Sequence, residues 1–200
     1  MDVADTIAAV EDATTTERSR LGSDKALVAA TGATLEADAV RRAAATREAG
    51  IATALAAWVD DAEGAIAGAF DRAATAASER CDRLEAATDD PDALAAHLRT
   101  VEGTAERVGA GLVGAPLVAD RFYLQVVSFF VNEADERGAE LARDLRRGAG
   151  DLGPARDALA TLGEAERERA RDAAIAAVGV AYDEYADTLA SMGLDPKPVC

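Results

Sequence analysis

Apolar side chains recur at alternating steps of three and four residues along most of the chain, the spacing of one face of an α-helix. Four stretches keep this pattern long enough to form the helices of a bundle, at residues 35–60, 64–88, 92–132 and 164–192. The third is the longest, with an apolar seam from Leu94 to Phe129. No stretch shows the two-residue alternation of a strand. The pattern predicts an all-α fold, an antiparallel four-helix bundle with additional short helices.

Breaks between these stretches indicate how the chain is organised. Within the third stretch, Pro116 lacks a backbone N–H and follows three nearby glycines, so it should kink or break that helix. We expect a single domain over residues 1–200, made of short helices at 1–33, a first helical hairpin at 35–88, a second helical half at 92–192 and an exposed tail at 193–200.

The composition favours helices that pack closely. Alanine supplies 51 of the 200 residues, whereas only 8 residues are aromatic. Alanine is the strongest helix former and a poor strand former. Because large side chains are scarce, we expect Trp58, at the end of the first long helix, to anchor the core. Half of the aromatic residues are Phe122, Tyr123, Phe129 and Phe130, which form either core or the interface of a homodimer.

The charge of the chain excludes one class of partner. There are 37 acidic residues against 19 arginines and 2 lysines, which gives a net charge of −16. Such a surface repels nucleic acid and anionic lipid. It is typical of a solvated surface adapted to a salt-rich cytoplasm, and the alternative is an acidic surface that binds a partner.

The start of the chain and its most apolar run bear on localisation. The first residues lack the basic start and apolar core of a signal peptide. The run at 122–131 is about half as long as a membrane helix needs to be. We therefore expect a cytoplasmic protein with no membrane partner.

Four phrases stand out along the chain: "LGSDKALVAATG", "TAERVGAGLVGAPLVADRF", "FFVNEAD" and "LASMGLDPKPVC". They resemble phrases of rubrerythrin-like, ferritin-like proteins of halophilic archaea, some of which carry a transcription anti-termination label. The resemblance covers nearly the whole chain. It implies a ferritin-like bundle and a cytosol of high salt concentration.

The ligand set of a ferritin-like di-iron site can be tested against the helical pattern. Such a site needs one Glu from each of two helices and Glu-x-x-His from each of the other two. Glu48 lies on the inner stripe of its helix, but Ser78 and Cys81 occupy the Glu-x-x-His places of the second helix. The one histidine, His97, cannot complete two such pairs. We therefore predict no metal site of this kind, no catalytic residue and no cofactor.

Cys81 and Glu48 can each be interpreted in more than one way. Cys81 lies on an apolar stripe, where a thiol is more often a small buried hydrophobe than a redox group. Its neighbours Arg80 and Arg83 are expected to point outward. A buried carboxylate is costly unless it is paired. Glu48 therefore lies at the edge of the stripe or finds an Arg, Ser or Tyr partner, or else it is a residual functional carboxylate.

Three functional hypotheses follow. The first is a non-catalytic ferritin-like bundle that acts as a binding or structural module, with another protein or a second copy of itself as partner. The second is a rubrerythrin-like enzyme that handles iron or peroxide, with iron at an atypical site around Glu48, Ser78, Cys81 and Tyr182. The third is a role in transcription anti-termination through protein contacts, because no basic stripe or nucleic-acid fold is visible.

Overall fold

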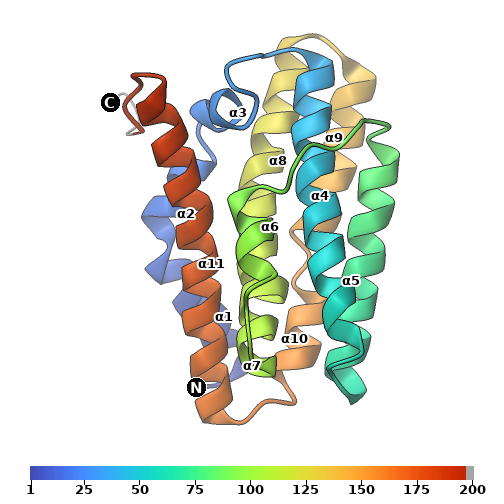
Figure 1. The fold of residues 1–200 in the computed structure, drawn as a ribbon, viewed down its shortest axis with the longest axis vertical. Helices are drawn as coiled ribbons and strands as arrows, with labels where there is room; N and C mark the ends of the chain where they lie inside the picture. Colours follow the sequence, from blue (N-terminus) through green and yellow to red (C-terminus); the bar gives the residue numbers. More distant parts are fainter. Residues whose placement is uncertain (197–200) are drawn as a thin grey trace.

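The computed structural model describes residues 1–196, and every regular element in that range is a helix, which confirms the all-α prediction (Figure 1). The helices are α1 (Val3–Ala13), α2 (Thr15–Leu21), α3 (Lys25–Ala30), α4 (Ala37–Val59), α5 (Gly64–Arg83), α6 (Ala93–Leu98), α7 (Thr104–Arg107), the π-helix η1 (Val108–Gly114), α8 (Ala115–Asn132), α9 (Glu136–Ala149), α10 (Gly153–Leu159) and α11 (Glu164–Ser191).

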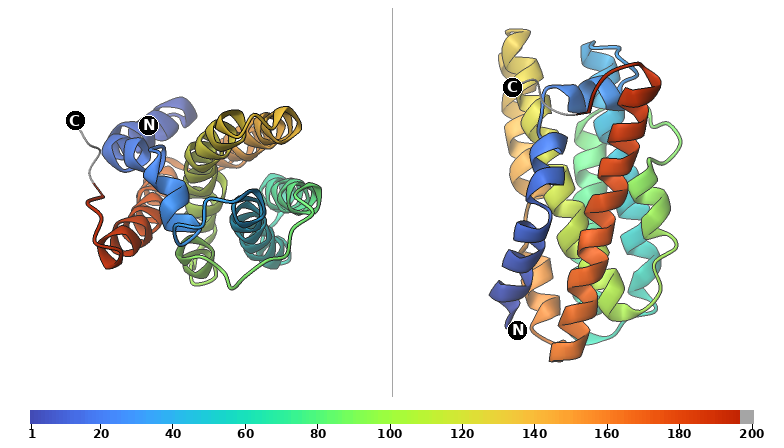
Figure 2. Two further views of the ribbon diagram at one scale, coloured as in Figure 1. Left: turned by 90° about the horizontal axis from the view of Figure 1, so that it is seen from above. Right: turned by 90° about the vertical axis from the view of Figure 1, so that its left-hand side faces the viewer.

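Two helical hairpins lie side by side. Helices α4 and α5 pack against each other along their length, and so do α8 and α9. The view from above in Figure 2 shows the two pairs next to each other, with α4 close to α8. Asp135 begins α9 by accepting a hydrogen bond from the backbone N–H of Gly138 at 2.9 Å. The buried side chains form two hydrophobic clusters, a smaller one where α4 meets α8 and α9, and a larger one around α4, α5, η1 and α11.

The third predicted helix is not continuous. Helix α6 ends at Leu98, residues 99–103 form a turn, and a new helix of 29 residues runs from Thr104 to Asn132. Gly103 has a φ of +85°, a conformation that L side chains rarely adopt, and it makes the turn into α7. The prediction of one helix over 92–132 is therefore wrong, because the chain changes direction at this glycine.

Pro116 is accommodated by a widened turn. In place of a break, the π-helix η1 leads directly into α8, and the N–H of Ala115 donates to the carbonyl of Ala110, five residues earlier. A proline in a regular α-helix clashes with the carbonyl one turn before it and leaves that carbonyl without a donor. The π register changes which carbonyl faces the ring, so the helix continues through the proline.

Glycine allows η1 to approach α11 closely. A Cβ atom added to Gly109 would stand 1.8 Å from the carbonyl oxygen of Ala170, so the two backbones are in direct contact there. Helix α11 runs the length of the molecule beside η1, and α1, α2 and α3 pack along it (Figures 1 and 2).

The predicted aromatic residues lie mostly inside the chain. Trp58 is 3% exposed, and its ring makes an edge contact with Phe70 at a centroid distance of 5.4 Å, which confirms its predicted burial. Three of the four interface candidates, Phe122, Tyr123 and Phe130, are buried in the core around α4, α8 and α9. Only Phe129 is partly exposed. Phe122, Tyr123 and Phe130 therefore fill the core of one chain, and Phe129 packs against that core with part of its ring exposed.

The helix from Thr104 to Asn132 is the one helix within residues 1–196 that is long and apolar enough to cross a membrane. The rest of the chain buries 61% of its most apolar window, which is the environment of a central core helix. Near the C-terminus, residues 193–195 of the predicted tail are exposed, which agrees with the prediction, and the carbonyl of Pro196 accepts a hydrogen bond from Tyr185. Residues 197–200 of that tail lie outside the described residues.

Candidate functional site

A carboxylate lies in the middle of the core. Glu48 of α4 is 1% exposed and shares its helix face with the buried residues Ala44, Ala45 and Ile51. Of the two structural alternatives predicted for Glu48, burial excludes the edge of the stripe and leaves a polar partner. Burying an ionised carboxylate is costly unless a partner compensates its charge.

The partner is Arg80, which reaches inward from α5. Its Nη2 atom lies 2.9 Å from Oε2 of Glu48, and its side chain is 13% exposed. The expectation that Arg80 points outward is wrong, because Arg80 stands three residues after buried Ala77 and four before buried Leu84. By contrast, the neighbouring Arg83 does face solvent, where it lies 3.5 Å from Asp144.

Tyr123 of α8 completes a polar cluster of three side chains, which we call the Glu48 cluster: Glu48, Arg80 and Tyr123. Burial raises the pKa of Glu48, and it outweighs the opposing effects of Arg80 and of the Tyr123 hydroxyl. Burial raises the pKa of Tyr123 well above its usual value, and the neighbouring Glu48 adds to that rise. Tyr123 therefore stays protonated, and Glu48 is easier to protonate than an exposed glutamate.

The Glu48 cluster is balanced in charge but poor in hydrogen bonds. Both carboxylate oxygens of Glu48, the Nε atom of Arg80 and the hydroxyl of Tyr123 are buried without a well-aligned partner among the described residues. The Tyr123 hydroxyl lowers the pKa of Glu48, yet no hydrogen bond of good geometry joins them. Buried polar groups normally find partners. The cluster therefore has unused hydrogen-bonding capacity.

The residues proposed for an atypical metal site are not brought together. Ser78 is exposed on α5, and Tyr182 of α11 accepts a hydrogen bond from Arg20. Within residues 1–196, no group of three or more His, Cys, Asp or Glu side chains could hold a metal ion. Glu48 faces a guanidinium instead of further carboxylates. These side chains do not fit a pair of iron ions.

Cys81 is only half-buried, so its predicted core position is right in part. Its Sγ atom lies 3.5 Å from the carbonyl oxygen of Ala45, to which the thiol donates. Burial raises the pKa of the Cys81 thiol, and the negative charges of Asp82 and Glu48 raise it further. A thiol with a raised pKa is a poor nucleophile. This environment favours a structural role.

A slot opens beside the Glu48 cluster, and the sequence analysis did not anticipate it. It has a volume of about 350 Å³ and lies between α4, α5, η1, the start of α8 and the connection from α9 to α10. Arg80 lines it, so the guanidinium that faces Glu48 also borders this slot. The remaining lining is mostly Ala, Gly, Ile, Leu and Pro.

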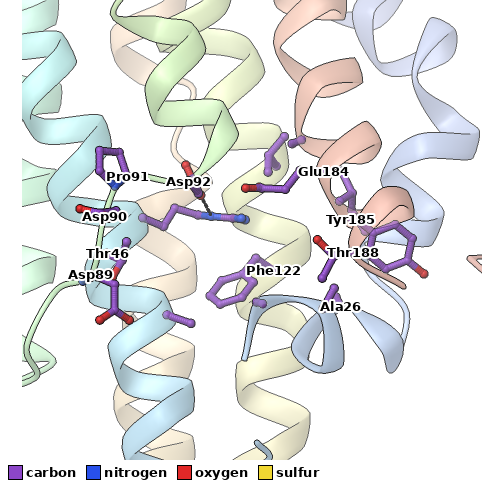
Figure 3. A pocket seen from close by; sticks show the side chains of 17 residues that line it. Ala26, Thr46, Asp89, Asp90, Pro91, Asp92, Phe122, Glu184, Tyr185 and Thr188 are labelled. Carbon is purple, nitrogen blue, oxygen red and sulfur yellow. Dashed lines mark hydrogen bonds and ion pairs between the residues drawn. The ribbon is translucent and has the colours of Figure 1, made fainter. Parts of the chain in front are cut away.

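A second pocket, of about 260 Å³, lies between α3, α4, α8, α11 and the residues before α6 (Figure 3). Arg47 donates through Nε to Asp92 at 2.9 Å and lies 4.6 Å over the ring of Phe122. In Figure 3, Glu184 extends from α11 towards Asp92, and it accepts a hydrogen bond from the N–H of Ala93 at 2.8 Å. Burial, followed by the charge of Asp92, raises the pKa of Glu184. These contacts fasten the start of α6 to α4 and α11.

The Glu48 cluster could have been found from the sequence by one signal. Arg80 occupies an inner position of the α5 stripe, between Ala77 and Leu84, as Glu48 does on α4. Two opposite charges on the inner faces of consecutive helices indicate a buried pair.

No family model, curated protein or solved structure matches this chain.

Proposed function

We propose that the protein is a non-catalytic, ferritin-like helical bundle that acts as a binding or structural module in a salt-rich cytosol. One observation carries the proposal: the guanidinium of Arg80 lies 2.9 Å from Glu48, in the interior where a ferritin-like protein holds its metal ions. A positive side chain belonging to the protein takes the role that the metal ions have in that family.

The arrangement of the hairpins supports the ferritin-like part of this proposal. Glu48, Arg80 and Tyr123 come from α4, α5 and α8, so their inner stripes converge on one point of the core. In ferritin-like bundles the ligands also project inward from facing helices. The fourth helix beside this point, α9, presents the small buried residues Ala142 and Ala149 with Leu145 between them.

The electrostatics support the non-catalytic part. Arg80 occupies one carboxylate oxygen of Glu48 and repels a divalent cation at the same place. Because the guanidinium does not lose its proton in proteins, its charge persists at every pH at which the protein is folded. A second carboxylate, which a di-iron site needs, does not face Glu48.

The experiment that tests the proposal is metal analysis after loading. The purified protein is incubated with excess Fe(II) or Mn(II) without oxygen, dialysed and analysed by mass spectrometry for metal, with a known di-iron protein treated in parallel. We expect substoichiometric metal in this chain and no consumption of hydrogen peroxide beyond that of free iron. Stoichiometric iron or manganese that survives dialysis would contradict the proposal.

A further inference from the structure

The slot beside Arg80 is shaped by small side chains. Its lining includes Ala73 and Ala76 of α5, Ala115 and Ala119 of α8, and Ala149 of α9. These small side chains leave a volume of about 350 Å³ unfilled. That volume is at the lower end of the range for ligand pockets, so the slot suits a small molecule.

The slot follows the axis of α5. Both Arg72 and Arg80 line it, and their separation of eight positions in the sequence corresponds to about 12 Å along the helix. The wall opposite includes Gly111 and Leu112 of the π-helix η1. Segments of π-helix frequently occur at functional sites. The lining of the slot therefore extends along α5 from Arg72 to Arg80.

The two arginines differ in their exposure and in their hydrogen-bonding partners. Arg72 lies 2.7 Å from Asp157, and both side chains are more than half exposed, so solvent screens this pair. Arg80 is 13% exposed, its charge contact is Glu48, and its Nε has no partner among the described residues. Gly148 of α9 lies beside it, since a Cβ there would come 3.7 Å from Nη1 of Arg80. The guanidinium of Arg80, whose Nε has no hydrogen-bond partner among the described residues, thus borders a slot lined mostly by apolar side chains.

We propose that this slot binds a small monocarboxylate with an unbranched apolar tail, whose carboxylate is held by Arg80 and whose tail lies along the alanine-lined wall. This proposal deepens the binding role proposed above and rests on it. A guanidinium matches a carboxylate in its planar, forked geometry. The alanine and leucine lining favours a hydrocarbon tail. An ammonium head group would find no acceptor on Arg80, because a guanidinium carries only donors.

The charges around the slot limit the ligand to one negative charge. Asp151 and Asp157 line the slot, and Glu48 stands behind Arg80. These acids disfavour a phosphate or a dicarboxylate. Glu48 balances Arg80 when the slot is empty, and because burial already raises its pKa it can accept a proton when a second carboxylate arrives.

The test uses octanoate as the probe on the full chain, by isothermal titration calorimetry in molar KCl. Octan-1-ol and octylamine are the matched ligands. We expect octanoate to bind once per chain, octan-1-ol to bind about tenfold more weakly because it lacks the charge-assisted contact, and octylamine not to bind. Absence of octanoate binding, or equal binding of the alcohol, overturns the proposal.

Two variants locate the site. Ala76→Leu fills the slot and should abolish octanoate binding, whereas Thr75→Leu, on the exposed face of the same helix, should leave it unchanged. Retained binding in Ala76→Leu, with circular dichroism showing a folded protein, overturns the assignment.

Because Arg80→Gln alone leaves Glu48 unpaired in the core, the double variant Glu48→Gln/Arg80→Gln tests the head group. This variant should lose the preference for octanoate over octan-1-ol, and a preserved preference counts against Arg80. All titrations are repeated with EDTA. Octanoate binding that is unaffected by EDTA supports the slot whatever the outcome of the metal analysis, so the two proposals fail independently.

Discussion

The Nη2 atom of Arg80 in α5 lies 2.9 Å from Oε2 of Glu48 in α4, and the two side chains are 13% and 1% exposed. This pair joins the two helices of the first hairpin across the core. Because little solvent reaches it, each charge depends on the other for compensation. The pair therefore determines both how the core responds to mutation and what the adjacent slot can bind.

Removing Arg80 should be far more costly than removing Arg83. Arg80→Met leaves the Glu48 carboxylate buried and unpaired, so we expect a loss of about 3–5 kcal/mol in the free energy of unfolding. Arg83→Met breaks only an exposed contact with Asp144 and should cost less than about 1 kcal/mol. Urea unfolding in molar KCl measures both. Similar losses of free energy in the two variants would show that the buried Glu48–Arg80 pair stabilises the fold no more than an exposed pair does.

Stability should depend on pH in a way that Glu48→Gln removes. Burial raises the pKa of Glu48 in the folded protein above its ordinary value of 4.5. The contribution of Glu48 to the free energy of unfolding is therefore fully present below pH 4.5 and is lost as the pH rises through the pKa of the folded state. The free energy of unfolding of the wild type minus that of Glu48→Gln should therefore fall over that window, by up to about 1.4 kcal/mol per pH unit. Urea unfolding at a series of pH values gives this difference, in which the other carboxylates cancel. A difference that rises with pH would mean that the attraction of Arg80 outweighs the cost of burial.

The close approach of η1 to α11 should make Gly109 irreplaceable. In Gly109→Ala the new Cβ would stand 1.8 Å from the carbonyl oxygen of Ala170, which is backbone and cannot turn aside. We expect a loss of about 3 kcal/mol or more. Gly179→Ala on α11 is the matched control, since nothing lies within 4 Å of its Cβ, and replacing a glycine inside a helix there should stabilise by about 0.5–1 kcal/mol. Thermal unfolding compares them, and an unaffected Gly109→Ala would disprove the contact.

The periodicity of the sequence predicted which faces are buried better than it predicted where helices end. Leu94, Leu98, Ala105, Val108 and Leu112 are all buried, as the seam requires. The same spacing continues across the turn at 99–103, so the pattern cannot distinguish one helix from two. The turn depends on the positive φ of Gly103, which periodicity does not report.

Only part of the candidate site was predicted from the sequence, and the reason is similar. Glu48 lies on the inner stripe, and the sequence already required an Arg, Ser or Tyr partner if it were buried. The partner Arg80 was assigned to the surface because charged side chains are usually solvated. A buried pair 32 residues apart in the sequence depends on how α4 and α5 dock, and the slot depends on five segments at once. Neither can be derived from the spacing within one helix.

Salt should stabilise the fold, because acids outnumber bases by 16, the difference between 37 and 21. Even if every basic group is paired once, 16 acids remain to repel one another. Asp61 and Asp92 have arginine partners, Arg107 and Arg47, at 2.9 Å. Salt weakens exposed pairs such as Asp61–Arg107, but it also screens the excess repulsion, and the excess repulsion is the larger quantity.

The range of that repulsion sets the size of the effect. The Debye length shortens from about 10 Å at 0.1 M salt to about 3 Å at 1 M, so acids on neighbouring helices cease to interact. We expect the melting temperature and the helical content measured by circular dichroism to rise between dilute buffer and molar KCl. The variant Asp60→Asn/Glu63→Gln, which removes two exposed acids beside α5, should begin at a higher melting temperature and gain less from salt. A melting temperature that stays constant from dilute to molar KCl would contradict the salt adaptation, and with it the salt-rich cytosol of the proposed function.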